Sequence, residues 1–335
     1  MGQASVGNRP VTTLVRSGRD AWSLRTWEGL VRKVVGWISL GLGAFLIMAS
    51  VMASTWATDR VEKTPLDVDS VTRLDGTAQR INTTTGGLDE FDVRATSYTQ
   101  ADSEASDDDV VVFVSYSCLV KDIPDTPDCG EPGQGENADP NIINVSEPSV
   151  FATDRRTAEA INDDGYLPEG TSETVGLVNK WPFGAEQTDY EVWDGLLGEP
   201  VTATFEGEEE LEGLDTYVYN VALTDEPAVV TGDIEGLYSQ DKTYWIEPHT
   251  GSIIKQTQVE QRTLEDGTVL LELDIAFTDD QVATNVSDSE ESVSSLTLIT
   301  STVPSLGLWI GIPLVVLGLG LLVVGRRSSG KRKDV

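Results

Sequence analysis

Two long uncharged runs, one near each end, dominate the hydropathy pattern of the chain. The first covers residues 34–57 (VVGWISLGLGAFLIMASVMASTWA) and the second covers residues 305–324 (SLGLWIGIPLVVLGLGLLVV). A helix rises about 1.5 Å per residue, so about twenty residues cross roughly 30 Å, the thickness of the hydrocarbon core of a bilayer. Trp37, Trp56 and Trp309 lie near the ends of the runs, as in the aromatic belts of membrane proteins. The pattern predicts one transmembrane helix near each end.

Basic residues flank both runs on the side of the chain termini. Residues 1–33 hold six basic and two acidic residues, and residues 325–335 hold five basic and one acidic residue. Cytoplasmic flanks of membrane spans carry such an excess of lysine and arginine. This predicts two cytoplasmic tails and places residues 58–304 on the extracytoplasmic side of a cell membrane. The alternative for the first run is a cleaved signal peptide, but its uncharged stretch exceeds the usual core of about 7–15 residues, which favours an uncleaved anchor.

Alternating and β-branched patterns fill the region between the runs. Strand-like segments occur at residues 109–120, 201–205, 216–223, 243–246, 253–259 and 269–277. Turn-forming clusters separate them, among them EGEEELEG, EDG and PHTG, at spacings typical of antiparallel meanders. The segment DRRTAEAIND predicts one helix around residues 155–160. The expected fold is a mainly β ectodomain of antiparallel sheets with few helices, anchored by a transmembrane helix at each end.

The spacing of apolar residues changes to that of a helix just before the second uncharged run. Thr278 and Gln281 have the spacing of a capping box, and the two acids between them suit a helix N-terminus. The apolar residues that follow are spaced as a narrow helical stripe. They are Val282, Val286, Val293 and Leu296. The spacing predicts a membrane-proximal helix over about 279–303 that docks on the sheet and ends near Pro304.

The net charge and the reactive residues of the chain exclude several classes of function. The formal net charge is −33, and residues 58–304 hold 53 acidic against 12 basic residues, an excess that repels phosphate and excludes nucleic acid as a partner of this region. Its acid runs lack the spaced oxygen ligands of a calcium loop and predict a solvated surface. The only histidine, His249, lies in a predicted turn without a nucleophile motif nearby. Nothing singles out a carboxylate pair, a metal site or a cofactor site, so we expect a protein that is not an enzyme.

Cys118 and Cys129 are the only cysteines. In an oxidising compartment their spacing allows a disulfide across a short loop rich in proline and acid, which contributes about 3 kcal/mol through the unfolded state. Two free thiols are the alternative, and two cysteines with so few other ligands argue against a zinc site. We expect the disulfide.

Glycines lie at matching depths in the two predicted spans. Gly36, Gly41 and Gly43 fall in the cytoplasmic half of the first, and Gly318 and Gly320 fall in the cytoplasmic half of the second. Small residues let membrane helices approach closely, so these glycines predict that the spans pack as an antiparallel pair. The alternative is that the glycines are merely tolerated, because glycine is common in membrane helices.

Five segments, in this order and between two spans, resemble the actinobacterial porin PorA family, two-span envelope proteins first catalogued as a domain of unknown function. The segments are VEKTPLDVDS, NKWPFGAEQTDYEVWDGLLGEPVTATFEG, ELEGLDTYVYNV, YWIEPHTGSIIKQ and AFTDDQVATNV. The resemblance covers roughly residues 32–325. It implies an integral membrane protein of the cell envelope and, through the family name, a porin-associated role.

Two functional hypotheses follow for the external domain. In the first, it encloses an apolar cavity and binds or conveys envelope lipid or another hydrophobic ligand, a layout that resembles the doubly anchored class B scavenger receptors. In the second, it is a structural or scaffolding partner of other envelope proteins. Pore formation by this chain alone is not expected, because two apolar helices enclose no aqueous channel and the strands lack the lipid-facing band of a membrane barrel.

Overall fold

The computed structural model describes residues 20–82, 84–129 and 139–330. The chain divides into a helical unit, which comprises the residues up to Ala57 and from Ile299 onward, and a β domain, Thr58–Leu298. Each unit is described by itself. The outer parts of both basic tails lie outside the described residues.

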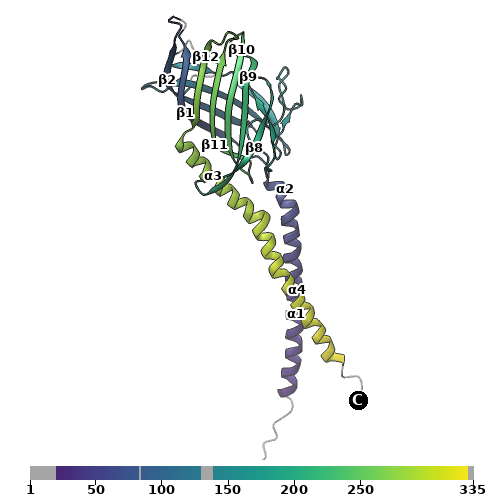
Figure 1. Cartoon of the computed structure of the whole chain (residues 1–335). Helices are drawn as coiled ribbons and strands as arrows, with labels where there is room; N and C mark the ends of the chain where they lie inside the picture. Colours follow the sequence, from purple (N-terminus) through teal and green to yellow (C-terminus); the bar gives the residue numbers. More distant parts are fainter. Residues whose placement is uncertain (1–19, 83, 130–138, 331–335) are drawn as a thin grey trace, which may run out of the picture. The chain divides into compact units, whose positions relative to one another are not determined.

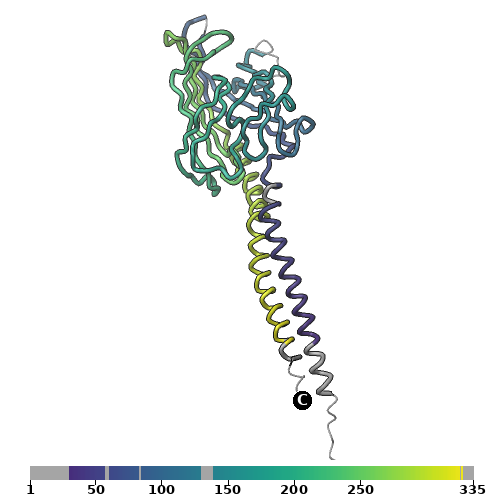
Figure 2. Tube along the Cα trace, turned by 90° about the vertical axis from the view of Figure 1, so that its right-hand side faces the viewer, coloured from purple at the N-terminus to yellow at the C-terminus, as the bar shows by residue number. Residues whose placement is uncertain are grey.

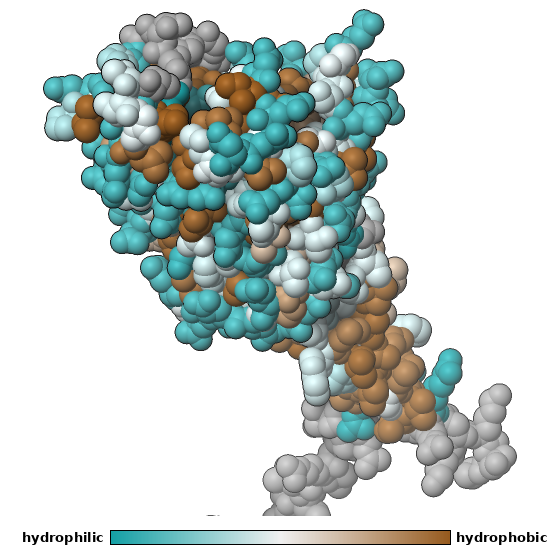
Figure 3. Space-filling view, turned by 45° about the horizontal axis from the view of Figure 1, so that its top comes forward, coloured by the Kyte–Doolittle hydropathy of each residue, from teal (hydrophilic) through white to brown (hydrophobic). Residues whose placement is uncertain are grey.

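The helical unit consists of α1 (Asp20–Met52), a π-helical turn at Ala53–Ala57, and α4 (Val303–Gly330). Two helical stretches, Leu30–Trp56 and Asp279–Val324, are long and apolar enough to cross a membrane. Large apolar side chains point outward along both helices, with Phe45 65% and Trp309 80% exposed. In Figure 3, the surface of the helices is mainly hydrophobic, whereas the surface of the β domain is mostly hydrophilic. Exposed apolar area of this extent suits lipid and not water.

The β domain is one long antiparallel sheet (Figure 1). Its strands are β1 (Asp69–Ile81), β2 (Leu88–Asp102), β3 (Val110–Lys121), β4 (Ile142–Val145), β5 (Ser149–Asp154), β6 (Ala160–Ile161), β7 (Tyr190–Asp194), β8 (Glu199–Leu211), β9 (Leu214–Thr231), β10 (Ile234–Glu247), β11 (Ser252–Thr263) and β12 (Val269–Phe277). Their order across the sheet is β6-β5-β3-β2-β1-β12-β11-β10-β9-β8-β7, with β4 paired to β3. The mainly β fold expected from the sequence is confirmed.

The sheet curls until its two edges are linked through one short segment. Ala160, in the edge strand β6, donates its backbone N–H to the carbonyl of Gly176 over 3.0 Å. Leu177 donates to Glu191 over 2.8 Å, and its carbonyl accepts from Trp193 over 2.7 Å, which ties the same segment to β7. Figure 2 shows the resulting arrangement, with the green strands of β8–β12 facing the blue and teal segments across the domain. The polar backbone groups at these edges are therefore paired, which a sheet edge requires.

Helix α3 (Asp279–Thr297) begins where the capping pattern predicted. The Thr278 hydroxyl accepts the backbone N–H of Gln281 over 3.1 Å. Val282 and Val286 are buried and pack against Ile254 of β11, which is 0% exposed. The predicted docking on the sheet is therefore present. The α-helix is shorter than 279–303, because Leu298–Thr302 forms a π-helical turn.

The helix predicted around residues 155–160 is wrong. The Asp154 carboxylate accepts the backbone N–H groups of Arg156 and Thr157, over 2.8 and 2.7 Å, which closes a turn. Ala158 then has φ of 60°, a left-handed conformation that no α-helix contains. The chain continues directly into β6. The hydrogen bonds from the backbone to the Asp154 carboxylate thus outweigh the helix propensity of the alanines.

The acidic cluster EGEEELEG is not a turn over its whole length. Its first six residues extend β8 to Leu211, and only Glu212 and Gly213 turn the chain into β9. Both have positive φ, 53° and 94°. Glu206, Glu208, Glu209 and Glu210 are all exposed, so both faces of this end of the strand meet solvent and a row of charge is tolerated there. In contrast, the turn predicted at PHTG is present, with Gly251 at φ 72°.

Candidate ligand-binding cavity

The structure joins Cys118 to Cys129 in a disulfide, with Cα atoms 5.5 Å apart. Cys118 is buried at 2% exposure in β3, and Cys129 lies in the loop that leaves this strand. Arg94 donates to the Asp128 carboxylate over 3.0 Å in the same loop. The bridge predicted from spacing is confirmed, and it fixes the start of a loop beside the sheet. A reporter inserted near Gly130, in the continuation of this loop, would test its predicted external location; Gly130 itself lies outside the described residues.

Three of the five glycines considered for span packing lie at the helix contact. A Cβ built on Gly36 would meet Leu322 at 3.1 Å, and one on Gly43 would meet the carbonyl oxygen of Gly311 at 2.7 Å. A Cβ on Gly318 would meet the carbonyl oxygen of Gly36 at 2.7 Å. The earlier residue of α1, Gly36, thus contacts later residues of α4 than Gly43 does, so the two helices pack antiparallel.

The other two glycines face away from the contact. A Cβ built on Gly41 or on Gly320 would meet nothing within 4 Å. Residues seven apart return to the same face of a helix, as Gly36 and Gly43 do, whereas Gly41 is two residues from Gly43 and points elsewhere. Glycines predicted at the same depth in the membrane therefore do not all point toward the other helix. Gly311 takes the place of Gly320 at the contact.

His249 lies on the surface of the turn between β10 and β11. Its side chain is 66% exposed, and its Nδ1 lies 2.7 Å from a carboxylate oxygen of Glu247. Glu247, only 1% exposed, also accepts the backbone N–H and the hydroxyl of Thr250, over 2.7 and 2.6 Å. This carboxylate holds the turn closed. In the described part of the chain, no group of three His, Cys, Asp or Glu residues is placed to hold a metal ion.

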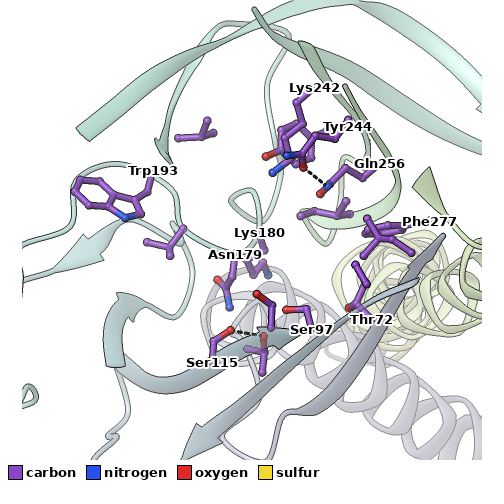
Figure 4. Close-up of a pocket in the computed structure, with 18 of the residues that line it drawn as sticks. Thr72, Ser97, Ser115, Asn179, Lys180, Trp193, Lys242, Tyr244, Gln256 and Phe277 are labelled. Carbon is purple, nitrogen blue, oxygen red and sulfur yellow. Dashed lines mark hydrogen bonds between the residues drawn. The ribbon is translucent and has the colours of Figure 1, made fainter. Parts of the chain in front are cut away.

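A cavity of about 420 Å³ lies inside the curled sheet, and we call it the polar cavity. Its walls come from strands far apart in the sheet order and from the loop after Leu177 (Figure 4). The polar side chains that line it are Thr72, Thr96, Ser97, Thr99, Ser115, Ser117, Asn179, Lys180, Lys242, Gln256 and Gln258. In Figure 4, Asn179 and Lys180 lie close to Ser97 and Ser115, and Lys242, Tyr244 and Gln256 form the opposite wall.

A larger cavity of about 860 Å³ adjoins the first, and we call it the apolar cavity. The two share Ala95, Ser117 and Ile275 in their linings. Apolar side chains make up most of the wall of the larger one, including Ile81, Leu119, Ile143, Leu196, Val229, Val230, Ile234, Leu270, Leu271 and Leu273. Several come from the tip of the β9–β10 hairpin and from the start of β12. The domain therefore offers two adjoining compartments, and apolar residue types are more frequent in the wall of the larger one.

Two lysines give the polar cavity its charge. Burial lowers the pKa of Lys180 to about 7, an effect that nearby Glu247 partly offsets. For Lys242, burial acts in the same direction, but Tyr244, Asp194 and Glu260 outweigh it, and its pKa lies above the ordinary value. None of the ion pairs among the described residues includes either lysine.

Trp181 and Asn179 line the polar cavity with polar atoms that have no hydrogen-bond partner in the described part of the chain. The Trp181 side chain is 2% exposed, and its ring packs against those of Tyr219 and Tyr244, with centroids 5.3 and 4.9 Å apart. A buried donor without an acceptor costs about 1–3 kcal/mol. The Nε1–H of Trp181 and the Oδ1 of Asn179 are themselves buried behind the cavity surface, so they are unpaired atoms of its wall and not exposed donors or acceptors.

Sequence reasoning missed this site. Lys180 and Trp181 lie in an irregular segment, NKWPFG, and meet Lys242 only because the sheet curls. The one available signal was the scarcity of basic residues between the spans, which makes each lysine there unusual. Pattern alone could not show which of them point inward.

The chain combines two long helices with outward apolar side chains and a curled antiparallel sheet, and these features define a membrane protein with a mainly β domain. The chain contacts the lipid bilayer through these helices. The chain belongs to the porin PorA family, whose family model matches residues 35–320. No curated protein matches the chain.

Proposed function

We propose that this is a two-pass protein of an actinobacterial cell envelope, with both termini in the cytoplasm and residues 58–304 outside the cell membrane. We further propose that its β domain binds or conveys a hydrophobic ligand, such as an envelope lipid, and has no catalytic role. The basic flanks of both spans support the topology. The family match supports the envelope location.

The adjoining cavities are the observation that carries the proposed ligand. Protein interiors are normally packed with few voids larger than a water molecule. Ligand sites, in contrast, are concave, mostly apolar and supplied with a few polar groups. The apolar cavity of about 860 Å³ and its polar neighbour have this composition. A domain that served only as a scaffold has no need of such a space.

Site-specific photo-crosslinking in living cells tests this proposal. A benzophenone amino acid replaces Gln258, which lines the polar cavity, or Val259, the next residue of β11, which is 52% exposed. Successive side chains of a strand point to opposite faces, so the two sites differ mainly in direction. After irradiation, the full chain is purified and its peptides are searched for adducts of lipid mass.

We expect lipid adducts at position 258 and not at position 259. Equal yields at the two positions would show only non-specific contact with membrane lipid. Adducts to other envelope proteins, without lipid, would replace this proposal with a scaffolding role.

A further inference from the structure

The charges that line the two cavities are opposite in sign to those of the domain around them. Residues 58–304 hold 53 acidic and 12 basic residues. Nevertheless, the charged residues that line the cavities are Lys180, Lys242, Arg80 and Arg262, and no described carboxylate lines either cavity. If charged residues were distributed at random in this domain, most of those that line the cavities would be acidic. The interior is therefore basic inside an acidic shell.

The two lysines differ from Arg262 in how their charge is balanced. Arg262 forms an ion pair with the buried Glu260, with Nε 2.5 Å from the carboxylate. Among the described residues, the Lys180 ammonium lies 3.4 Å from the Thr64 hydroxyl and 3.7 Å from the centroid of the Phe183 ring, and the charge of Glu247 acts on it without an ion pair. Lys242 lies 5.1 Å from the centroid of the Tyr244 ring. A buried ammonium without a paired carboxylate is costly, and a bound anion would offset this cost.

The nearby carboxylates are held by other groups. Glu247 is held by the turn that it closes, as described above. Asp194 accepts the backbone N–H groups of Leu196 and Leu197, both over 2.9 Å, and lies 3.3 Å from the Tyr238 hydroxyl. Both residues are buried and do not line the cavity. Asp194 and Glu260 favour the charged form of Lys242 without forming an ion pair with it, and no ion pair among the described residues includes Lys180. A bound anion would supply the direct pairing that the described carboxylates do not.

We propose that the ligand is an anionic amphiphile, a carboxylate or phosphate head group on an acyl chain, bound in one orientation. This inference rests on the proposed function and specifies its ligand. The head group lies in the polar cavity, where it accepts from the ammonium groups of Lys180 and Lys242. The acyl chain passes the shared boundary at Ala95 and Ile275 into the apolar cavity. A small free anion would leave that larger compartment unused.

Photoactivatable lipids that differ only in charge test this inference. The full chain is placed in nanodiscs of zwitterionic phosphatidylcholine with diazirine-bearing palmitic acid or its methyl ester. A second pair, diazirine-bearing phosphatidic acid and the corresponding diacylglycerol, distinguishes a phosphate head group from a carboxylate. After irradiation, labelled peptides are quantified by mass spectrometry. Labelling of α1 and α4, which contact the bilayer, corrects for the amount of each probe in the disc.

We expect at least one anionic probe to label the β domain about tenfold more than its neutral counterpart, because charge-assisted hydrogen bonds discriminate to this extent. The Lys180→Gln and Lys242→Gln variants should each reduce this ratio, and the double variant should bring it close to one. Lys255→Gln is the matched control, since Lys255 stacks on Trp245, 4.4 Å from its centroid, and does not line a cavity. Retained labelling by the neutral probe shows that a variant is folded.

The possible failures separate the two proposals. Equal labelling by charged and neutral probes, unchanged in the lysine variants, overturns the anionic ligand and leaves a hydrophobic ligand in place. Absence of β-domain labelling by every probe, with the helices still labelled, overturns both.

Discussion

Replacing Lys180 by methionine should stabilise the protein in a pH-dependent way. Burial lowers the pKa of Lys180 from 10.5 to about 7 in the folded state. Below about pH 7 the ammonium is charged in both states, and the folded state carries the full cost of holding that charge inside. Between about pH 7 and pH 10.5 the unfolded state binds more protons, so the stability of the wild type rises with pH. Methionine is of similar length and removes the charge.

The magnitude follows from the difference between the two pKa values. At about 1.4 kcal/mol per pKa unit, the cost of the charged Lys180 is at most about 5 kcal/mol. Because the ammonium faces a cavity and not solid protein, screening reduces this figure, and we expect a gain of roughly 2–3 kcal/mol for Lys180→Met at about pH 6. The gain should shrink steadily and approach zero at about pH 10.

Urea unfolding of the detergent-solubilised full chain, followed by near-UV circular dichroism at about pH 6, 8 and 10, measures this difference. Lys255→Met, on the outer face of β11, is the control and should alter stability little at any of these pH values. A Lys180→Met variant that is less stable than wild type at about pH 6, or equally stabilised at every pH, would refute the assignment of an uncompensated buried charge.

Three further predictions concern the disulfide, the topology and the spans. Non-reducing mass spectrometry should recover linked peptides containing Cys118 and Cys129. Their separation of 11 residues implies that Cys129→Ser lowers the free energy of unfolding by about 3 kcal/mol. Equal stability of the protein with and without reductant would contradict this. Reporters fused to either terminus should be active only in the cytoplasm, and an external C-terminus would be incompatible with the proposed topology. Gly43→Leu should lower cross-linking between cysteines in α1 and α4, because its Cβ position lies 2.7 Å from a backbone oxygen, whereas Gly41→Leu should not. Equal effects of the two would mean that the helix contact lies elsewhere.

Features encoded over short stretches could be predicted from the sequence. The uncharged runs, the capping pattern at Thr278 and the turn at Gly251 all depend on residues within a few positions of one another. The same holds for the disulfide between Cys118 and Cys129, whose loop is short. Each corresponds to a described element.

Features that depend on distant pairing could not be predicted. Strands β1 and β2 carry few strand-like runs, because residues such as Thr72, Ser97 and Thr99 point into a polar cavity and not into an apolar core. Alternation of apolar and polar residues in β2 is confined to Phe91, Val93 and Ala95 and does not continue through residues 96–100. The cavity itself unites Lys180 and Lys242 through the curling of the whole sheet, which no local pattern encodes.

The pairing of β1 with β12 has a consequence for biogenesis. Leu74 is aligned with Phe277, so the first long strand finds one neighbour only in the last strand of the domain. Such long-range contacts are slow to form, because the entropy of a large loop is lost before the contact is gained. In the proposed topology, the open side of β1 stays unpaired until nearly the entire domain has crossed the membrane, and exposed strand edges favour aggregation. We therefore expect translocation of this domain to precede its folding, and we expect a chain truncated before β12 to be degraded instead of forming a smaller domain.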